Sequence, residues 1–178
     1  MDIVLVAAVA ENGVIGRAGG LPWRIRSDMR RFRAMTWGRP VVAGRKTYLS
    51  FPKRPLPGRT NVIVSRSSDF VVPGAIVAPT LTAALEVARG DALRRGADAI
   101  MVIGGADIYA QAMPLADRLE ITHIHTRAEG DTTFPAIDPA IWREAARSIH
   151  PPQEGDDAGY DALTYVRFRD ANARDDRS

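Results

Sequence analysis

Two nearly uninterrupted apolar runs limit what this chain can fold into. They read "IVLVAAVA" at 3–10 and "AIMVIGG" at 99–105. A strand with one face in water alternates apolar and polar residues, whereas a strand buried on both faces is apolar throughout. Both runs are much shorter than the ~20 residues that a helix needs to cross a bilayer. We therefore expect two strands at the centre of a parallel sheet that is covered on both faces.

The segments around these runs predict alternating strands and helices. Further short strands are expected at 39–44 and 61–65. Helices are expected at 27–36, 81–95 and 106–113, with a short one beginning at Arg45. In 81–95 the apolar residues recur three and four positions apart, and Thr80 can cap this helix. The alternation predicts an α/β sheet.

The last third of the chain changes character. Partly alternating strands are expected at 118–125, 142–150 and 163–170. The polar loop 151–159 joins the last two and indicates an antiparallel edge. In the final strand we expect Val166 and Phe168 to face the core and Arg167 and Arg169 to face solvent.

Composition excludes several classes of protein. The 178 residues suffice for a core in one domain, expected over 1–170, with a disordered tail over 171–178. The chain has no cysteine, which excludes disulfides and fits a cytoplasmic protein. The three histidines lack the spacing of a metal site, so no metal is expected. The start, Met1-Asp2, has no basic leader, so no signal peptide is expected.

The charge of the chain is unevenly distributed. Residues 1–100 contain 16 basic and 7 acidic residues, whereas the rest contains 8 basic and 14 acidic residues. A basic half attracts small anions or nucleic acid. The basic residues are scattered and not interleaved with aromatics, which favours a small anionic ligand.

A single acid, Asp28, stands in the basic stretch "LPWRIRSDMRRF" at 21–32. Helical spacing places it on an apolar stripe with Ile25, Met29, Phe32 and Met35. The residues leave two interpretations open. In one, Ser27 caps the helix and Asp28 complements the positive end of the helix dipole. In the other, Asp28 is a functional carboxylate.

Three junctions after strands carry groups that suit phosphate. They are "VVAGRKTYLS" at 41–50, "VSRSS" at 64–68 and "VIGGADIY" at 102–109. Helix N-termini bind phosphate through free N–H groups, and arginine binds phosphate monoesters. None matches a Walker loop or the dinucleotide fingerprint, so ordinary turns with solvated cations remain the alternative. The glycine-rich loop 10–23 suits a mobile lid or a merely irregular connection.

Together these segments resemble the dihydrofolate reductase family in its bacterial, monomeric form. Each motif is weak alone, but their order and approximate spacing hold over about residues 3–170. The matching stretches are "VIG" (14–16), "LPW" (21–23), Asp28 with Phe32, "GRKTY" (44–48), "RPLPGR" (54–59), "VIGGADIY" (102–109), "THI" (122–124) and "EGDTTFP" (129–135).

The resemblance implies an eight-stranded, mostly parallel mixed sheet with four helices and a C-terminal antiparallel hairpin. It implies NADPH-dependent reduction of 7,8-dihydrofolate to tetrahydrofolate, with antifolates as inhibitors. It also implies a cis peptide between Gly104 and Gly105. We expect a cytoplasmic monomer that binds neither nucleic acid nor membranes.

The resemblance assigns substrate and catalytic roles to individual residues. Asp28 would hold the pterin N3 and 2-amino group, Thr122 would bond this carboxylate, and Arg59 would pair with the α-carboxylate of the substrate's glutamate. The pterin and aminobenzoyl slot would be lined by Val6, Ala7, Phe32, Leu56 and Ile103. The remaining catalytic positions are Leu21, Trp23 and Tyr109, with the tyrosine near the hydride path.

Cofactor positions follow from the same resemblance. Ala8 and Ile15 would offer backbone groups to the nicotinamide carboxamide, and Ser65 with Arg66 would contact the 2′-phosphate. The remaining cofactor positions, mostly around the pyrophosphate, are Gly16, Gly44, Arg45, Lys46, Thr47, Gly104, Gly105, Ala106 and Ile108.

The resemblance also implies how the pterin gains its proton. No acidic side chain reaches pterin N5 in this family, so ionised Asp28 would raise the basicity of the pterin and water would deliver the proton. Burial raises the pKa of such a carboxyl, whereas Thr122 and the ligand's donors favour its charged form.

Other functions remain open at this point. The pyrimidine reductase of riboflavin synthesis shares the architecture and NADPH but has no evident use for Asp28, "LPW" and Arg59. A non-catalytic NADPH-binding protein would gain nothing from Asp28 together with Thr122. A basic nucleic-acid binder would show strong, salt-dependent retention on DNA.

Overall fold

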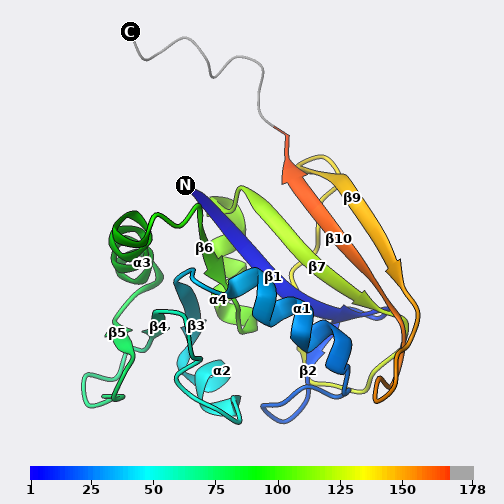
Figure 1. Ribbon diagram of the computed structural model, residues 1–178, viewed down its shortest axis with the longest axis horizontal. Coiled ribbons are helices and arrows are strands. Elements are labelled where there is room, and N and C mark those ends of the chain that lie inside the picture. The colour runs from blue at the N-terminus through cyan, green and yellow to red at the C-terminus, as the bar shows by residue number, and fades with distance from the viewer. Residues whose placement is uncertain (169–178) are drawn as a thin grey trace, which may run out of the picture.

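The computed structural model describes residues 1–168 and consists of an eight-stranded sheet flanked by helices (Figure 1). The strand order is β5-β4-β3-β6-β1-β7-β10-β9. These strands are β1 (Asp2–Ala10), β3 (Val41–Gly44), β4 (Asn61–Val64), β5 (Ile76–Ala78), β6 (Ala99–Val102), β7 (Arg118–Ile124), β9 (Trp142–His150) and β10 (Tyr160–Arg167). A separate pair joins β2 (Val14–Gly16) to β8 (Thr132–Thr133). The tail predicted over 171–178 lies outside the described residues, as does Arg169.

The two apolar runs form the centre of the sheet, which confirms that prediction. β1 pairs in parallel with β6 on one side and with β7 on the other. Val4 and Leu5 of β1 and Ile100 and Val102 of β6 are completely buried. Within the described part of the chain, no helix is long and apolar enough to span a membrane.

The helices cover both faces of the sheet. They are α1 (Arg26–Thr36), α2 (Arg45–Ser50), α3 (Leu81–Arg95) and α4 (Ala106–Ala112), and a 3-10 turn (Met113–Leu115) follows the last. Leu85 of α3 and Ile108 of α4 pack on one face, while Phe32 of α1 and Tyr48 of α2 pack on the other. In Figure 1, α1 crosses in front of β1. The predicted cap of α3 is confirmed, because the Thr80 hydroxyl oxygen accepts a hydrogen bond from the N–H of the third helical residue.

The C-terminal hairpin is confirmed, but the inward position of Phe168 is wrong. β10 is antiparallel to both β7 and β9, so β9 forms the edge. The strand ends at Arg167, and Phe168 beyond it is 50% exposed. Arg167 is itself half-buried, with its guanidinium 4.5 Å from the centre of the Trp142 ring. The alternation fails there because the guanidinium stacks over the aromatic ring and donates hydrogen bonds to the carbonyls of Ala116 and Met113.

The prediction that Ser27 caps α1 is also wrong. The N-cap residue is Ile25, which offers no side-chain hydrogen bond. Asp156, in the loop between β9 and β10, accepts hydrogen bonds from the Ser27 N–H at 3.0 Å and from the Ser27 hydroxyl. Desolvation acts to raise the pKa of Asp156, but the hydrogen bonds from Ser27 and Gln153 outweigh it and lower this pKa to about 2. A distant loop therefore supplies the cap.

We expect Asp156→Ala to destabilise the protein at neutral pH. Loss of a helix cap costs about 0.5–2 kcal/mol, and each kcal/mol lowers Tm by roughly 2–4 °C in a chain of this size. Because the folded pKa lies below the unfolded value, this stability is present above about pH 4 and is lost as pH falls toward about 2. Thermal unfolding at pH 7 and pH 3 measures the difference. Asp156→Asn keeps an acceptor and should lose less, whereas equal Tm values for Asp156→Ala and wild type at pH 7 would contradict the cap.

Candidate active site

The buried carboxylate of α1 meets a hydroxyl from the centre of the sheet. Asp28 is 8% exposed and Thr122 of β7 is 3% exposed. The Thr122 hydroxyl donates a hydrogen bond to Asp28 Oδ1 at 2.6 Å. Asp28 therefore has a partner far outside its own helix, whereas Asp156 caps that helix. The arrangement matches what the functional interpretation of Asp28 requires.

Arg31 lies beside this contact and pairs with two carboxylates, those of Asp28 and Glu120. The sequence analysis did not predict this arrangement. Arg31 Nη1 lies 3.9 Å from Asp28 Oδ1, and Arg31 Nη2 lies 3.4 Å from Glu120 Oε2 of β7. The i,i+3 spacing of Asp28 and Arg31 was a usable signal, because residues three apart are neighbours on a helix. Nothing local in the sequence indicates that Glu120 joins them.

Burial dominates the ionisation of Asp28. Desolvation raises the pKa of Asp28 above its usual value, while the Thr122 hydrogen bond and the Arg31 charge act against this rise. Asp156 also raises the pKa through its charge, and His150 lowers it. The net direction is upward, so protonated Asp28 persists to higher pH than an exposed aspartic acid would.

Most of the predicted substrate slot lies in one apolar cluster on the α1 side of the sheet. Val6 and Ile103 are buried there, and Phe32 and Leu56 pack against them half-buried. Ala7 belongs to the cluster on the opposite face, because successive strand residues alternate between faces. Only the backbone of Ala7 can border the slot.

Arg59 is buried without an acidic partner. Its residue exposure is 9%, and its guanidinium donates to Thr36 Oγ1 at 2.9 Å and to the Pro57 carbonyl at 3.0 Å. Among the described residues, no carboxylate lies within ion-pairing distance of it. Desolvation and the nearby Arg33 lower the pKa of Arg59. A desolvated guanidinium with free donors is suited to bind a carboxylate ligand.

The two glycine junctions meet at one edge of the sheet. The Gly104–Gly105 peptide is cis, as the resemblance implies. The Gly44 N–H donates to the Gly104 carbonyl at 2.7 Å. A Cβ on Gly105 would lie 3.0 Å from Thr47 Oγ1, and one on Gly104 would lie 2.9 Å from the Tyr109 ring. Glycine is therefore required for this close approach.

Tyr109 packs against the backbone of Gly104. Its hydroxyl donates to the Val6 carbonyl at 2.6 Å, and its ring packs edge-on against Phe134 at 4.9 Å between centroids. Complete burial raises the pKa of Tyr109. The residue is thus a neutral phenol that ties α4 to the middle of β1. Ala106 and Ile108 lie on the same short helix.

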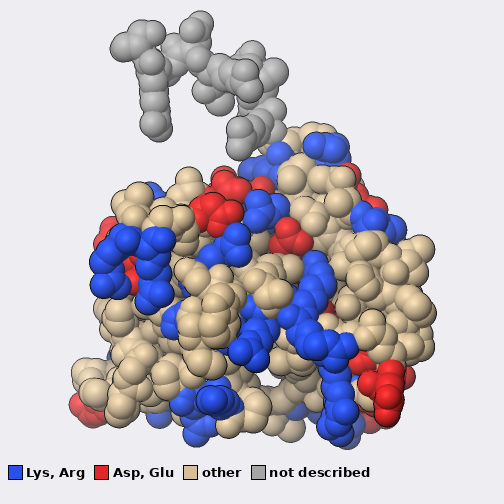
Figure 2. Space-filling view, viewed as in Figure 1, with Lys and Arg blue, Asp and Glu red and all other residues tan. Residues whose placement is uncertain are grey.

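The remaining residues that are predicted to bind phosphate lie at the same C-terminal ends of the strands. Gly44 and Val64 are paired residues of β3 and β4, so Arg45 and Ser65 follow neighbouring strand ends. Ligands in open α/β sheets bind outside these carboxyl ends. Ser65 is buried, whereas three cations are exposed and lack carboxylate partners among the described residues: Arg45, Lys46 and Arg66. In Figure 2 basic side chains gather over α1 and α2, and the surface is hollowed between α2 and the loop after β2.

The loop predicted as a lid is tied to the segment around β8. β2, which holds Ile15 and Gly16, pairs with β8, and the Ala18 N–H donates to Asp131 Oδ2 at 3.2 Å. Ala8 is half-buried on β1. At the far end of the loop, Leu21 is 54% exposed and Trp23 is 9% exposed.

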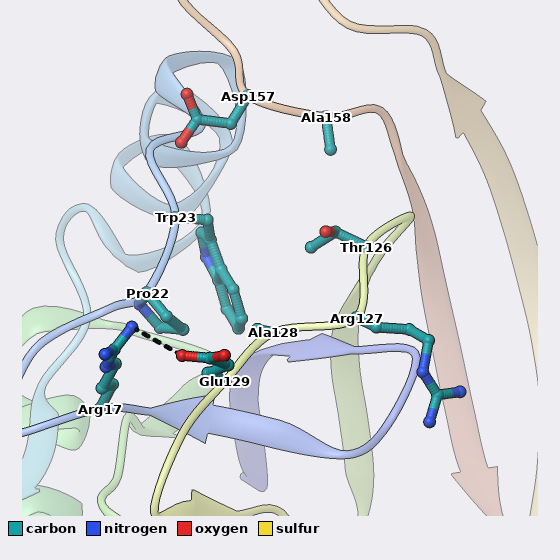
Figure 3. A pocket seen from close by; sticks show the side chains of 9 residues that line it. All are labelled: Arg17, Pro22, Trp23, Thr126, Arg127, Ala128, Glu129, Asp157 and Ala158. Atoms are coloured by element: carbon teal, nitrogen blue, oxygen red, sulfur yellow. Dashed lines mark ion pairs between the residues drawn. The ribbon is translucent and has the colours of Figure 1, made fainter.

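Trp23 forms one wall of a small cavity (Figure 3). Its volume is about 230 Å³. Its lining includes the ion pair between Arg17 and Glu129, whose nearest atoms are 3.4 Å apart. Neither Asp28 nor Thr122 lines this cavity, so it is distinct from the predicted substrate slot.

Comparison with known proteins decides between the families that this architecture allows. A family model described as dihydrofolate reductase matches residues 2–167. The chain belongs to the dihydrofolate reductase family. It is 48% identical over 148 residues to a dihydrofolate reductase of Neisseria meningitidis serogroup A, covering 83% of this chain and 88% of the relative. It is 43% identical over 169 residues to the type 3 dihydrofolate reductase of Salmonella typhimurium, covering 95% and 100%.

A solved dihydrofolate reductase has the same fold. The enzyme from Enterococcus faecalis, complexed with NADP(H) and RAB-propyl, superposes with a TM-score of 0.83 at 31% identity. The match covers 94% of this chain and 97% of the other. The mostly parallel sheet, four helices and terminal hairpin are therefore the dihydrofolate reductase fold.

Proposed function

We infer that this chain catalyses the NADPH-dependent reduction of 7,8-dihydrofolate to tetrahydrofolate. One observation carries the inference beyond family membership: the buried Asp28 carboxylate accepts a hydrogen bond from Thr122 and lies on the same helix that packs Phe32 against the apolar cluster of predicted substrate residues. The family match favours this reaction over the pyrimidine reductase and nucleic-acid alternatives. An inert NADPH-binding protein would not need a carboxylate whose burial costs free energy.

Asp28 is suited to hold the pterin through two adjacent donors. A carboxylate has about four acceptor sites, and Thr122 occupies one of them on Oδ1. The remaining sites accept the N3–H and 2-amino hydrogens of the substrate. The negative charge makes the bound pterin more basic, so N5 takes its proton from water.

The residues present fit the implied cofactor. NADPH supplies the hydride that pterin C6 receives. Gly104 and Gly105 carry no Cβ, so their backbone packs closely against the Tyr109 ring and Thr47 Oγ1 where α4 begins. The exposed Arg45, Lys46 and Arg66 provide positive charge for the pyrophosphate and the 2′-phosphate, with Ser65 at the same strand end.

Position within the slot accounts for much of the remaining catalysis. Arg59 would hold the glutamate α-carboxylate at the far end, and apolar residues would enclose the ring between the two anchors. Such fixed placement converts binding energy into a reactive geometry and excludes water from the reacting atoms. The monomeric state and the cytoplasmic location stay predictions.

The direct test is the absorbance loss of NADPH by the purified chain with and without dihydrofolate. We expect rapid, dihydrofolate-dependent oxidation and a tetrahydrofolate product in equal amount. Circular dichroism and NADPH binding establish that the sample is folded. A folded, NADPH-binding protein that shows no oxidation dependent on dihydrofolate would overturn the proposal.

We expect a strong preference for NADPH over NADH that depends on Arg66. A hydrogen bond to a charged group contributes about 1.5–3 kcal/mol, so Arg66→Ala should lower kcat/KM for NADPH by roughly 10- to 150-fold. Efficiency with NADH should hardly change, because NADH lacks the 2′-phosphate. Equal efficiencies of the two cofactors in the wild type would refute the assignment of Ser65 and Arg66.

A further inference from the structure

Arg31 links the catalytic carboxylate to Glu120, a half-buried acid of the sheet. It follows Asp28 by one helical turn, and its side chain is 22% exposed. Its Nη1 donates to Thr122 Oγ1 at 3.2 Å and lies 3.9 Å from Asp28 Oδ1. Its Nη2 contacts Glu120 Oε2 at 3.4 Å. One guanidinium therefore contacts both members of the Asp28–Thr122 pair and also Glu120.

Glu120 is held in place by one residue of its own strand and one of the neighbouring strand β10. The Thr164 hydroxyl of β10 donates to Glu120 Oε2 at 2.9 Å, and Arg118 Nε lies 3.1 Å from Glu120 Oε1. The Glu120 side chain is 14% exposed. These contacts restrict the acid and thereby the guanidinium that pairs with it.

We propose that Arg31 is a positioning residue for the reduction: held by Glu120, it directs the Thr122 hydroxyl proton toward Asp28 and favours the ionised form of that carboxylate. The effect of Arg31 on catalysis rests on the proposed function. The structural content of the proposal, a coupling of Arg31 to the ionisation of Asp28, can be measured without substrate.

Hydrogen-bond chemistry sets the direction of the Thr122 proton. A guanidinium has five donors and no acceptor, so Thr122 Oγ1 can only accept from Arg31. The single hydroxyl proton is then left for Asp28 Oδ1 at 2.6 Å. Oδ1 therefore acts as an acceptor in this contact, which leaves Oδ2 to face the pterin.

The groups that act on the ionisation of Asp28 come from four parts of the fold: α1, β7, β9 and the loop between β9 and β10. Arg31 on α1 and His150 on β9 favour its ionised form, and Thr122 on β7 adds a hydrogen bond. Burial and Asp156 oppose ionisation. Glu120 faces Arg31 and partly neutralises it. Arg31 is thus the cation closest to an otherwise desolvated carboxylate, and Glu120 limits how strongly it acts.

The experiment titrates Asp28 in the ligand-free protein by NMR of 13C-labelled aspartate carboxyls. The Asp28 signal is assigned as the one that is missing in Asp28→Asn. An opposite charge within about 4–6 Å typically lowers a carboxyl pKa by roughly 1–3 units. We expect Arg31→Met to raise the titration midpoint of Asp28 by about one unit, near the lower end of that range because Glu120 shares the charge. Glu120→Gln should lower the midpoint.

Two control variants separate electrostatics from folding. Arg31→Lys keeps the charge and should stay near the wild-type midpoint. Arg30→Met removes the neighbouring arginine, which bonds Gln153 and not Asp28, and should leave the midpoint unchanged. A structural defect common to Arg31→Met and Glu120→Gln would shift the Asp28 midpoint in the same direction in both variants. The proposal instead expects opposite shifts. If Arg31→Met does not fold, the downward shift in Glu120→Gln decides the matter.

The proposal is overturned if Arg31→Met leaves the Asp28 midpoint where it is, or if Glu120→Gln raises it. During turnover, the midpoint of the pH profile of hydride transfer should move to higher pH in Arg31→Met. The affinity for NADPH should change little. Absence of dihydrofolate turnover in the wild type would count against the proposed function alone, since the NMR titration needs no substrate.

Discussion

Asp28→Asn is expected to slow hydride transfer at neutral pH by orders of magnitude while the protein stays folded. The amide has nearly the same shape, and Thr122 can still donate to its oxygen. The substituted side chain carries no charge, so it cannot raise the basicity of the bound pterin. The substrate must then arrive already protonated. The rate in the variant should therefore rise as pH is lowered well past the point where the wild-type rate levels off.

Single-turnover hydride transfer between about pH 4.5 and 9 measures this profile. NADPH affinity is the internal control, because the residues proposed to bind its phosphates follow β3, β4 and β6 and are not among the groups that act on Asp28. A near-normal rate at pH 7 with an unchanged pH profile would contradict a catalytic role.

Thermal unfolding of the same variant distinguishes the two interpretations of Asp28. If Asp28 only complemented the helix dipole, its replacement would cost roughly 0.3–1 kcal/mol. Burial instead raises the folded pKa of Asp28 above its unfolded value, so the wild type loses stability as pH rises from about 4 through the folded pKa. Asp28→Asn escapes this loss. We expect its Tm at pH 7 to equal or exceed that of the wild type.

Arg59→Ala is expected to weaken dihydrofolate binding by at least about 100-fold, if two charge-assisted hydrogen bonds of about 1.5–3 kcal/mol each are lost. Binding of a pterin that lacks the glutamate tail should hardly change. The reason is that Arg59 is buried with no acidic partner among the described residues, so a ligand carboxylate would be its counter-charge. Fluorescence titration with both ligands measures the two affinities.

Arg59→Lys tests whether geometry or charge matters at this position. Lysine keeps the charge but cannot form two parallel hydrogen bonds to a carboxylate, so an intermediate loss is expected. Thermal unfolding of each variant checks the contact with Thr36, which a substitution also removes. An equal loss of affinity for both ligands would mean that Arg59 supports the fold and does not bind the tail.

The sequence predicted best the elements whose signal is local. β1 and β6 are apolar throughout, and α3 has both periodicity and a threonine cap, so each was placed within a few residues of its observed bounds. β5 has only three residues, and β8 has two, which is too short for alternation to show. These strands exist because neighbouring backbone groups pair with them, which no local pattern reports.

The candidate site shows the same division between local and distant information. The resemblance identified Asp28 and Thr122, and the structure brings them together. The cap on Ser27 and the Arg31–Glu120 contact depend on residues far away in the chain, so inspection of the helix sequence could not reveal them. Met29 shows the converse, because its helical spacing predicted a place on the buried stripe and the residue is 50% exposed. Burial depends on what packs opposite, which helical spacing alone does not specify.

The cap of α1 has a consequence for how the protein is made. Asp156 lies 129 positions after Ser27, so the ribosome produces the helix long before it produces the residue that closes the first turn. α1 has 11 residues, and isolated helices shorter than about 12–15 residues are marginal in water. Asp28, the carboxylate proposed to bind folate, therefore lies on a helix whose first turn is closed only after Asp156 has been made. The helix that carries Asp28 is therefore synthesised well before the loop that completes it.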